Sequence, residues 1–366
     1  MENSSNIFYI SIIIVASLFA QLSQTIYIKK GRNYGFPILI LAYLIITLPV
    51  ALRYNTGADY SSYVNTYEIV KAQGIYDPFG YPMEIGYILL NYICFKLFDD
   101  YQSVFIIMAL LTNYFFFKGI LYEFKKINLG LAVFAYGFSL YFWDYIIIRN
   151  MLGIAIIFYA LRFIFEKKII KYFLAVTIAV LFHYSLIIFY FIGIFYVEKF
   201  KKYRMPLAII SILIIPVIPN IINLFGTKLS LIWIQFSTYD SYLAKVKFGL
   251  DKYGIICALP LIPFSIFYKR LKKLNEHISL YFSFYIISIV LLLFSSEMPL
   301  MYRYVYALWP SQIILFSSLL NILGKRRKVI ASLVILCIFI YGIVLINYFI
   351  NNEIYYMLPY ISIFQR

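Results

Sequence analysis

The chain has 366 residues, of which 63% are hydrophobic and 13% charged, and its formal net charge is +16. This apolar content exceeds that of a soluble globular domain, so we expect an all-α polytopic membrane protein. Most lysines and arginines form short runs between apolar stretches. Membrane insertion explains such runs as cytoplasmic loops, and no nucleic-acid partner is needed.

The first apolar stretch, residues 7–28, predicts a helix that runs from outside to inside, because a basic run at 29–32 follows it. It is too long for the core of a signal peptide and lacks a small-residue cleavage site. Residues 36–52 lead back out. Residues 53–98 are then an extracytoplasmic loop, in which 84–98 is short enough for a re-entrant or interfacial helix; a full crossing there stays open.

Apolar stretches continue to the end of the chain. We predict further crossings at about 102–124, 129–148, 150–165, 170–183, 186–198, 205–225, 254–268, 278–296, 304–323 and 329–350. These give about 12 transmembrane helices (11 to 13) in one integral membrane domain, 1–366, with both ends outside. The segments 170–183 and 186–198 are short for a crossing and indicate a helical hairpin broken near His183. Residues 226–253 form a second extracytoplasmic loop.

Three arginines outside the basic runs lie at the outer ends of predicted helices: Arg53, Arg149 and Arg303. Each alone fits a side chain that reaches the membrane interface, and Arg149 has Asp144 as a potential partner. Three guanidinium groups on one side of the membrane instead favour a diphosphate site, because a planar guanidinium binds phosphate oxygens in pairs.

Titratable side chains accompany these arginines on the same side. They are Asp59, Glu84, Glu297 and His183. An ionisable group in an apolar segment is a functional candidate, and imidazole suits proton transfer; a structural histidine bonded to Ser185 is the alternative to this role for His183. Gly57 permits a backbone bend that turns Asp59 toward the helix ends. Asp59 is therefore the better candidate base, although loop carboxylates are often simply solvated.

Motifs of soluble nucleotide and metal chemistry do not occur. The sequence has no Gly-rich phosphate loop, HExxH, nucleophile elbow, paired CxxC or D-x-D-like run. We expect no metal and no cofactor, and a lipid-borne donor rather than a nucleotide sugar. The many tyrosines fit interfacial belts, and aromatic faces also stack on sugar rings.

The order and spacing of several segments resemble the EpsG-type branch of the Wzy O-antigen and capsular polysaccharide polymerases. The segments are "LRYNTGADYSSYVNTYE", "EIGYILLNY", "IIIRNMLGIAIIFYALRFIFEKK", "AVLFHYSLIIF" and "MYRYVYALWP". They extend from the start of the chain to about residue 310, and "YYMLPYISIF" is similar to the ending of that family. Asn150 departs from the glutamine of many relatives, and Tyr184 and Leu186 stand where smaller residues are common.

The resemblance implies a glycosyltransferase of GT-C-like architecture in the bacterial inner membrane, with its active site facing the periplasm. It would join oligosaccharide repeat units carried on undecaprenyl diphosphate by inverting transfer without a metal ion. The implied diphosphate ligands are Arg53, Arg149 and Arg303. The implied catalytic groups are Asp59, His183 and Glu84. The implied sugar path is lined by Tyr60, Tyr63, Tyr87 and Glu297.

Two other functions stay open at this point: a flippase or transporter of lipid-linked oligosaccharide, and a transferase similar to O-antigen ligases. A transporter needs charges along a route to both faces, whereas the candidate residues all lie on the outer side. The expected partners are undecaprenyl-diphosphate-linked oligosaccharide, membrane lipid and, for a polymerase, a chain-length regulator protein.

Overall fold

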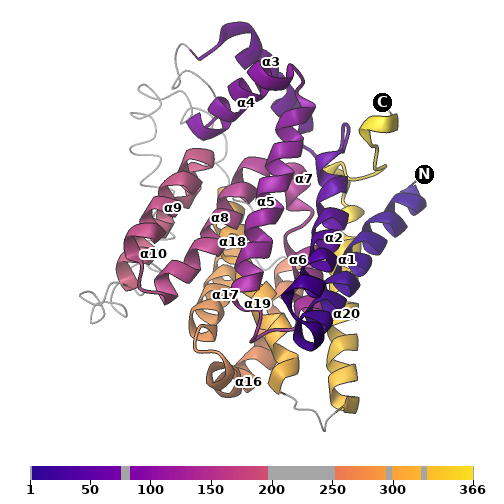
Figure 1. Cartoon of the computed structure of the whole chain (residues 1–366), viewed down its shortest axis with the longest axis vertical. Coiled ribbons are helices and arrows are strands. Elements are labelled where there is room, and N and C mark those ends of the chain that lie inside the picture. The colour runs from indigo at the N-terminus through magenta and orange to yellow at the C-terminus, as the bar shows by residue number, and fades with distance from the viewer. Residues whose placement is uncertain (1, 76–82, 197–251, 294–298, 323–327, 366) are drawn as a thin grey trace.

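The computed structural model describes residues 2–75, 83–196, 252–293, 299–322 and 328–365 (Figure 1). Within these ranges the backbone is helical and contains no strand; one isolated antiparallel bridge joins Arg53 to Ser362. The structure therefore agrees with the all-α class expected from the sequence.

The described ranges contain the following helices in chain order. They are α1 (Glu2–Lys30), α2 (Arg32–Ala51), α3 (Tyr60–Gln73), α4 (Ile85–Phe98), α5 (Gln102–Tyr122), α6 (Leu129–Ser139), α7 (Trp143–Ile146), α8 (Ile148–Phe165), α9 (Ile169–Phe182), α10 (Ile188–Tyr196), α15 (Lys252–Ala258), α16 (Leu261–Leu274), α17 (Ile278–Leu293), α18 (Pro299–Leu308), α19 (Pro310–Ser318) and α20 (Lys328–Ile350). Short 3-10 helices are η1 (Tyr184–Ile187), η4 (Leu319–Ile322), η5 (Glu353–Tyr355) and η6 (Ile363–Gln365).

Seven helical segments of the described ranges are long and apolar enough to cross a membrane, and several further apolar helices have 10–17 residues. The composition and the helix lengths are thus those of a multi-pass membrane protein. Twelve membrane helices stay a prediction, because the expected span 205–225 lies outside the described residues. The expected loop 226–253 also falls almost wholly outside them.

The expected single crossing at 129–148 is wrong in detail. The helix ends at Ser139, and a four-residue helix, α7, precedes α8. Every residue from 140 to 146 is buried. Irregular backbone at membrane depth is tolerated where protein surrounds it, and no glycine or proline at 140–142 marks this break in the sequence.

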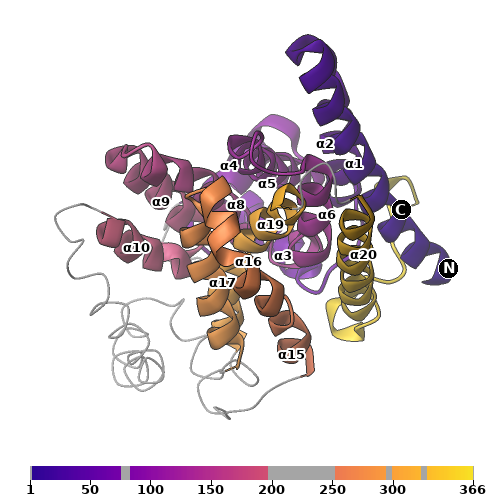
Figure 2. The same cartoon turned by 90° about the horizontal axis from the view of Figure 1, so that it is seen from below.

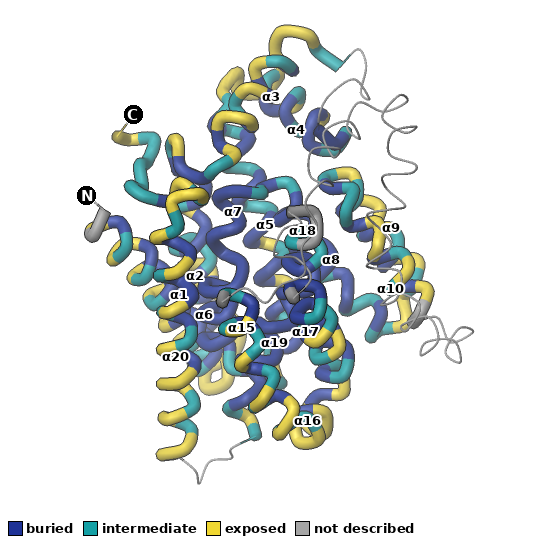
Figure 3. The backbone as a smooth tube through the Cα atoms, turned by 180° about the vertical axis from the view of Figure 1, so that it is seen from behind, coloured by how far each residue is buried: buried dark blue, intermediate teal, exposed yellow. Residues whose placement is uncertain are grey.

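The helices form a central group with two flanks (Figures 1 and 2). Helices α5, α6, α8 and α19 lie in the middle, α9 and α10 on one flank, and α1, α2 and α20 on the other. The most apolar stretches of the spans Ile148–Phe165 and Tyr302–Ile322 are 78% and 83% buried, against 22% for Val329–Ile350. Figure 3 shows the same contrast between buried α8 and exposed α20. Arg149 and Arg303 thus belong to the two most enclosed of these spans.

One end of the molecule gathers the basic connections. Gln24 near the end of α1 donates to the carbonyls of Phe124 and Ile127 at 3.0 and 2.9 Å. The Lys126 ammonium lies 3.2 Å from Asn275 Oδ1, in the turn between α16 and α17. The basic runs at 29–32, 125–126 and 269–273 therefore share this end; the run at 199–204 lies outside the described residues.

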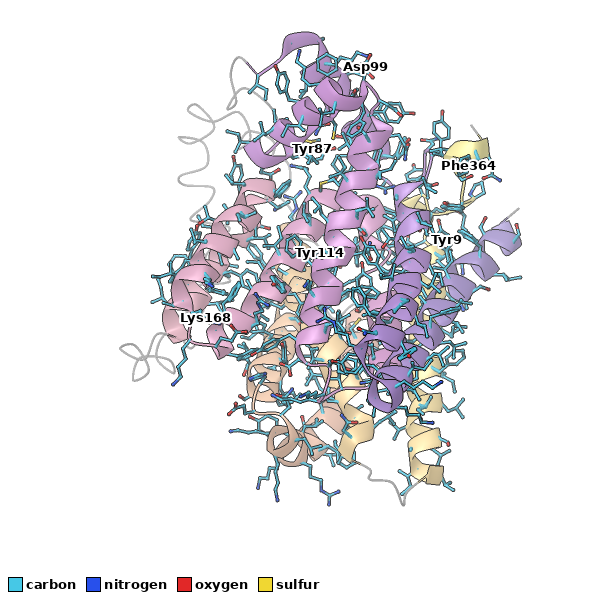
Figure 4. All side chains as sticks on the ribbon, in the orientation of Figure 1. Tyr9, Tyr87, Asp99, Tyr114, Lys168 and Phe364 are labelled. Carbon is cyan, nitrogen blue, oxygen red and sulfur yellow. The ribbon has the colours of Figure 1, made fainter. Side chains whose placement is uncertain are left out.

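Helices α3 and α4 cover the other end, where α2 stops and α8 begins (Figure 1). The C-terminal tail is tied to the loop after α2: Tyr54 N–H donates to Ile361 O at 2.8 Å, and Ile363 N–H donates to Leu52 O at 2.9 Å. Helix α3 lies within residues 53–98, for which the sequence predicts a loop with a helix only at 84–98. Figure 4 shows Asp99, at the end of α4, far from Lys168.

Candidate functional site

The core of the site is an ion pair between α8 and the start of α4. Arg149, the second residue of α8, donates from Nη1 to Glu84 Oε2. The other Glu84 oxygen accepts the backbone N–H of Tyr184 at 3.4 Å. The side chains are only 17% and 6% exposed, so solvent screens their attraction less than at an open surface.

A close backbone contact places Glu84 there. A Cβ atom added at Gly86 would lie 2.6 Å from the Leu181 carbonyl oxygen, so the first turn of α4 rests directly on the end of α9. Because only glycine permits this approach, Gly86 holds the Glu84 carboxylate beside the break that follows α9. The role of Gly86 has no signal in the sequence, since nothing in its neighbourhood shows which helix it would meet.

His183 forms the break after α9, as the sequence predicts. Its backbone is extended, with φ −158° and ψ 116°, between the last turn of α9 and η1. The ring nitrogen Nδ1 accepts the backbone N–H of Ser185 at 3.3 Å and lies 2.8 Å from the Ser185 hydroxyl. The hydrogen bond to Ser185, expected if His183 is a structural residue, is therefore present. Because Nδ1 accepts it, the proton of the neutral ring lies on Nε2.

Asp59 and Arg303 complete the charged group. Asp59 precedes α3 and is exposed at the surface. The surrounding protein raises the pKa of its carboxyl above the ordinary value, and the positive charges of Arg149 and Arg303 lower it part of the way back. The same two charges act on the His183 imidazole. Arg303 is on α18, which packs against η1 and α8.

Gly57 supplies the bend that turns Asp59 toward the helix ends. Its φ of +99° is in the region that favours glycine, and a Cβ atom there would lie 2.1 Å from the Tyr145 carbonyl oxygen. Gly57 N–H also donates to Tyr356 O at 3.0 Å. The predicted bend is confirmed, and it is fixed between α7 and the C-terminal tail.

A layer of tyrosines lies behind Arg149. The guanidinium carbon lies 5.9 Å from the ring centre of Tyr63 and 5.8 Å from that of Tyr87, and the two rings meet edge to face at 5.6 Å. Tyr60 stacks on Phe105 at 4.7 Å. The three tyrosines are 5%, 3% and 0% exposed in chain order, so they form a buried wall beside Arg149, and their contact with a sugar stays a prediction.

Arg53 lies on the far side of this layer. It is 1% exposed, donates from Nη1 to Val50 O at 2.7 Å, and stacks over Phe105 at 4.7 Å. Direct contact with the same ligand as Arg149, which the sequence analysis expected, does not fit this position. The reason is the bridge from Arg53 to Ser362, which draws this loop under the C-terminal tail.

Asp144 does not pair with Arg149, so the predicted Asp144–Arg149 pair is wrong. Its Oδ2 accepts the Asn113 amide at 3.1 Å, and Asn113 Oδ1 accepts the Tyr136 hydroxyl at 3.0 Å. The negative charge of Asp144 acts on Arg53 instead. A buried polar cluster around Arg53 is thereby separate from the charged group around Arg149.

Glu297 lies outside the described residues. Among the residues that the structure describes, no three His, Cys, Asp or Glu side chains come together to hold a metal ion, and the groups suited to a ligand are the anion-binding guanidiniums. Asn150 beside Arg149 is 1% exposed, and its side-chain amide has no partner in the described ranges.

Long apolar helices and a charged group at their ends define a polytopic helical membrane protein with a candidate anion site. The family model described as the EpsG family matches residues 36–362. The chain therefore belongs to the EpsG family, whose members are polymerase-like membrane proteins of the Wzy type. No curated protein and no solved structure matches the chain.

Proposed function

We propose that the protein is a glycosyltransferase that polymerises the oligosaccharide repeat units of a surface polysaccharide, such as an O-antigen. Its substrates would be repeat units carried on undecaprenyl diphosphate in the inner membrane. Family membership supports the polymerase-like class. The observation that carries the substrate class is the position of Arg149 at the start of α8, paired with Glu84, beside α18, which bears Arg303 and packs against α8 and η1.

The charge distribution supports an outer location for the site. The basic runs at 29–32, 125–126 and 269–273 lie at the end opposite α3 and α4, and such runs favour the cytoplasmic side of a membrane. The charged group would then face the periplasm, where lipid-linked units await polymerisation. A GT-C-like architecture is part of this proposal.

Transfer would proceed by a single inverting displacement. Arg149 and Arg303 hold the donor diphosphate, and a base takes the proton of the acceptor hydroxyl. The acceptor oxygen forms a bond to the donor sugar C1 while the bond from C1 to the diphosphate oxygen breaks, and the electron pair leaves with that oxygen. The two guanidiniums stabilise the negative charge that develops on the leaving diphosphate, so the step needs no metal ion.

Asp59 suits the role of base better than His183. Its carboxylate is at the surface, and its raised pKa makes it more basic than a freely solvated aspartate. The Nδ1 atom of His183 already accepts from Ser185, and the neutral ring then presents a donor at Nε2. His183 is therefore assigned to a hydrogen bond toward the substrate, with its orientation set by Ser185.

Charge-removing substitutions in a cell whose own copy has been deleted test this proposal. We predict that Arg149→Gln and Arg303→Gln each collapse the polysaccharide ladder on gels to single repeat units. Arg162→Gln, on the same helix as Arg149 but at its other end, is the matched control and should keep the ladder. Normal ladders in both site variants would exclude the diphosphate clamp.

The same gels separate the alternatives. A ligase-like transferase would leave long polymer on its lipid carrier and unattached to the final acceptor. A flippase would leave single repeat units trapped on the cytoplasmic side, where a membrane-impermeant glycosidase added to whole cells does not reach them.

A further inference from the structure

Arg149 is held by a carboxylate at the point where the proposed function places a phosphate. Glu84 Oε2 accepts from Arg149 Nη1, and both side chains are largely shielded from solvent. An arginine–carboxylate pair and an arginine–phosphate pair use the same donors. Glu84 and a diphosphate therefore compete for one guanidinium.

The contacts of Glu84 allow exchange. Arg149 is paired with Oε2 of Glu84. In the described ranges, the other oxygen, Oε1, accepts only one hydrogen bond, a long one of 3.4 Å from the backbone N–H of Tyr184. Arg149 Nε is buried and has no partner in that part of the chain. A phosphate oxygen that replaces the carboxylate at Nη1 keeps the arginine paired, and an unpaired arginine would be costly in a shielded site.

We propose that Glu84 occupies the diphosphate position of Arg149 between turnovers and displaces the product diphosphate after transfer. This inference rests on the proposed function and gives Glu84 a positioning role that acts through Arg149, in place of the acid–base role expected from the sequence. Electrostatics supports this displacement, since a carboxylate that returns to Arg149 neutralises the positive charge that holds the product diphosphate.

Affinity for a product-like probe tests the competition. The full chain is purified in detergent, and farnesyl diphosphate is titrated calorimetrically into wild type and variants. We expect Glu84→Gln to bind the probe about tenfold more tightly, because the isosteric amide keeps the side-chain shape and removes a competing, shielded charge. Arg149→Gln should bind it at least about tenfold more weakly.

Asp99→Asn is the matched control. It removes one carboxylate charge from the other end of α4, where Asp99 pairs with Lys71 at 2.5 Å and is 65% exposed. Its affinity should equal that of wild type, because solvent and salt screen an exposed charge. Tightening by Asp99→Asn equal to that by Glu84→Gln would overturn the inference, since net charge alone would explain both.

The outcomes separate the two proposals. Unchanged affinity in Glu84→Gln with weaker binding in Arg149→Gln would overturn competition and keep the clamp, and it is also what a general base at position 84 predicts. Unchanged affinity in Arg149→Gln would overturn clamp and competition together. Glu84→Asp, which keeps the charge on a shorter side chain, covers the case in which the glutamine variant aggregates: it should tighten binding by a smaller factor, and wild-type affinity would overturn the inference.

Discussion

Arg149 lies where the tyrosine layer, the first turn of α4 and the break after α9 meet. Its charge lowers the pKa of Asp59 and acts on His183, so one side chain links the proposed leaving-group site with the proposed base and with the proposed hydrogen-bond donor. An arginine that only reached the membrane interface would not need this degree of enclosure. At the residue scale, position therefore favours a functional role over an anchoring one.

Asp59 gives a pH-dependent prediction. The pKa of Asp59 is raised in the folded protein, so the ionised carboxylate destabilises the folded state. This destabilisation is fully present above the folded-state pKa and is absent below the unfolded-state pKa. Asp59→Asn should therefore raise Tm at neutral pH, with a gain that shrinks as the pH falls through that window, and should abolish transfer. Thermal unfolding in detergent at neutral and acidic pH measures this; a variant less stable than wild type at neutral pH would contradict it.

At the residue scale, the sequence identified the charged set but not its grouping. Arg149, Arg303, Asp59 and His183 were predictable because polar groups at the ends of apolar helices have few structural reasons to be there. Arg53 fits the same pattern, yet it bridges to Ser362, is 1% exposed and lies over the ring of Phe105. That pairing joins residues 309 positions apart and leaves no local signal.

At the scale of elements, two glycines with positive φ allow a matched comparison. Gly57 has φ +99° and its added Cβ would meet the Tyr145 carbonyl, whereas Gly31, with φ +92°, has no atom within 4 Å of the added Cβ. Gly31→Ala should cost roughly 1–3 kcal/mol from backbone strain alone. Gly57→Ala adds a steric clash worth about 1–3 kcal/mol more and displaces Asp59.

The two unfolding midpoints check this comparison. Gly57→Ala should show the larger decrease in Tm in detergent and should also shorten the polysaccharide ladder, while Gly31→Ala keeps its length. Equal decreases in Tm, or a full-length ladder from Gly57→Ala, would show that the loop before α3 does not depend on its contact with α7.

The elements differ in how well sequence predicts them. The break at His183 was predictable, because two apolar segments too short to cross a bilayer flank one ionisable residue. Helix α3 was not, since its mixed polar and aromatic residues form no apolar stretch. It is helical through burial of Tyr63 and Tyr67, whose rings meet Tyr87 of α4 and Tyr101 before α5. The break between α6 and α7 depends on tertiary packing in the same way.

At the scale of the whole molecule, the two ends differ in charge and in exposure to solvent. Basic connections gather at one end, and the shielded charged group lies at the other, on the two most enclosed spans. Hydropathy and the lysine runs predict this division, because insertion into a membrane depends on the same two properties. The pairing of neighbouring helices depends on close contacts, such as that of Gly86 in α4 with Leu181 in α9. No periodicity in the sequence encodes these contacts.

A density map of the protein with undecaprenyl diphosphate, in lipid nanodiscs and at side-chain resolution, tests the central claim most directly. We predict density for the diphosphate between Arg149 and Arg303, with Glu84 moved away from Arg149 and the isoprenoid chain against the neighbouring helices. A diphosphate bound at the basic connections near Lys126, or Arg149 still paired with Glu84 while the ligand is bound, would contradict the account.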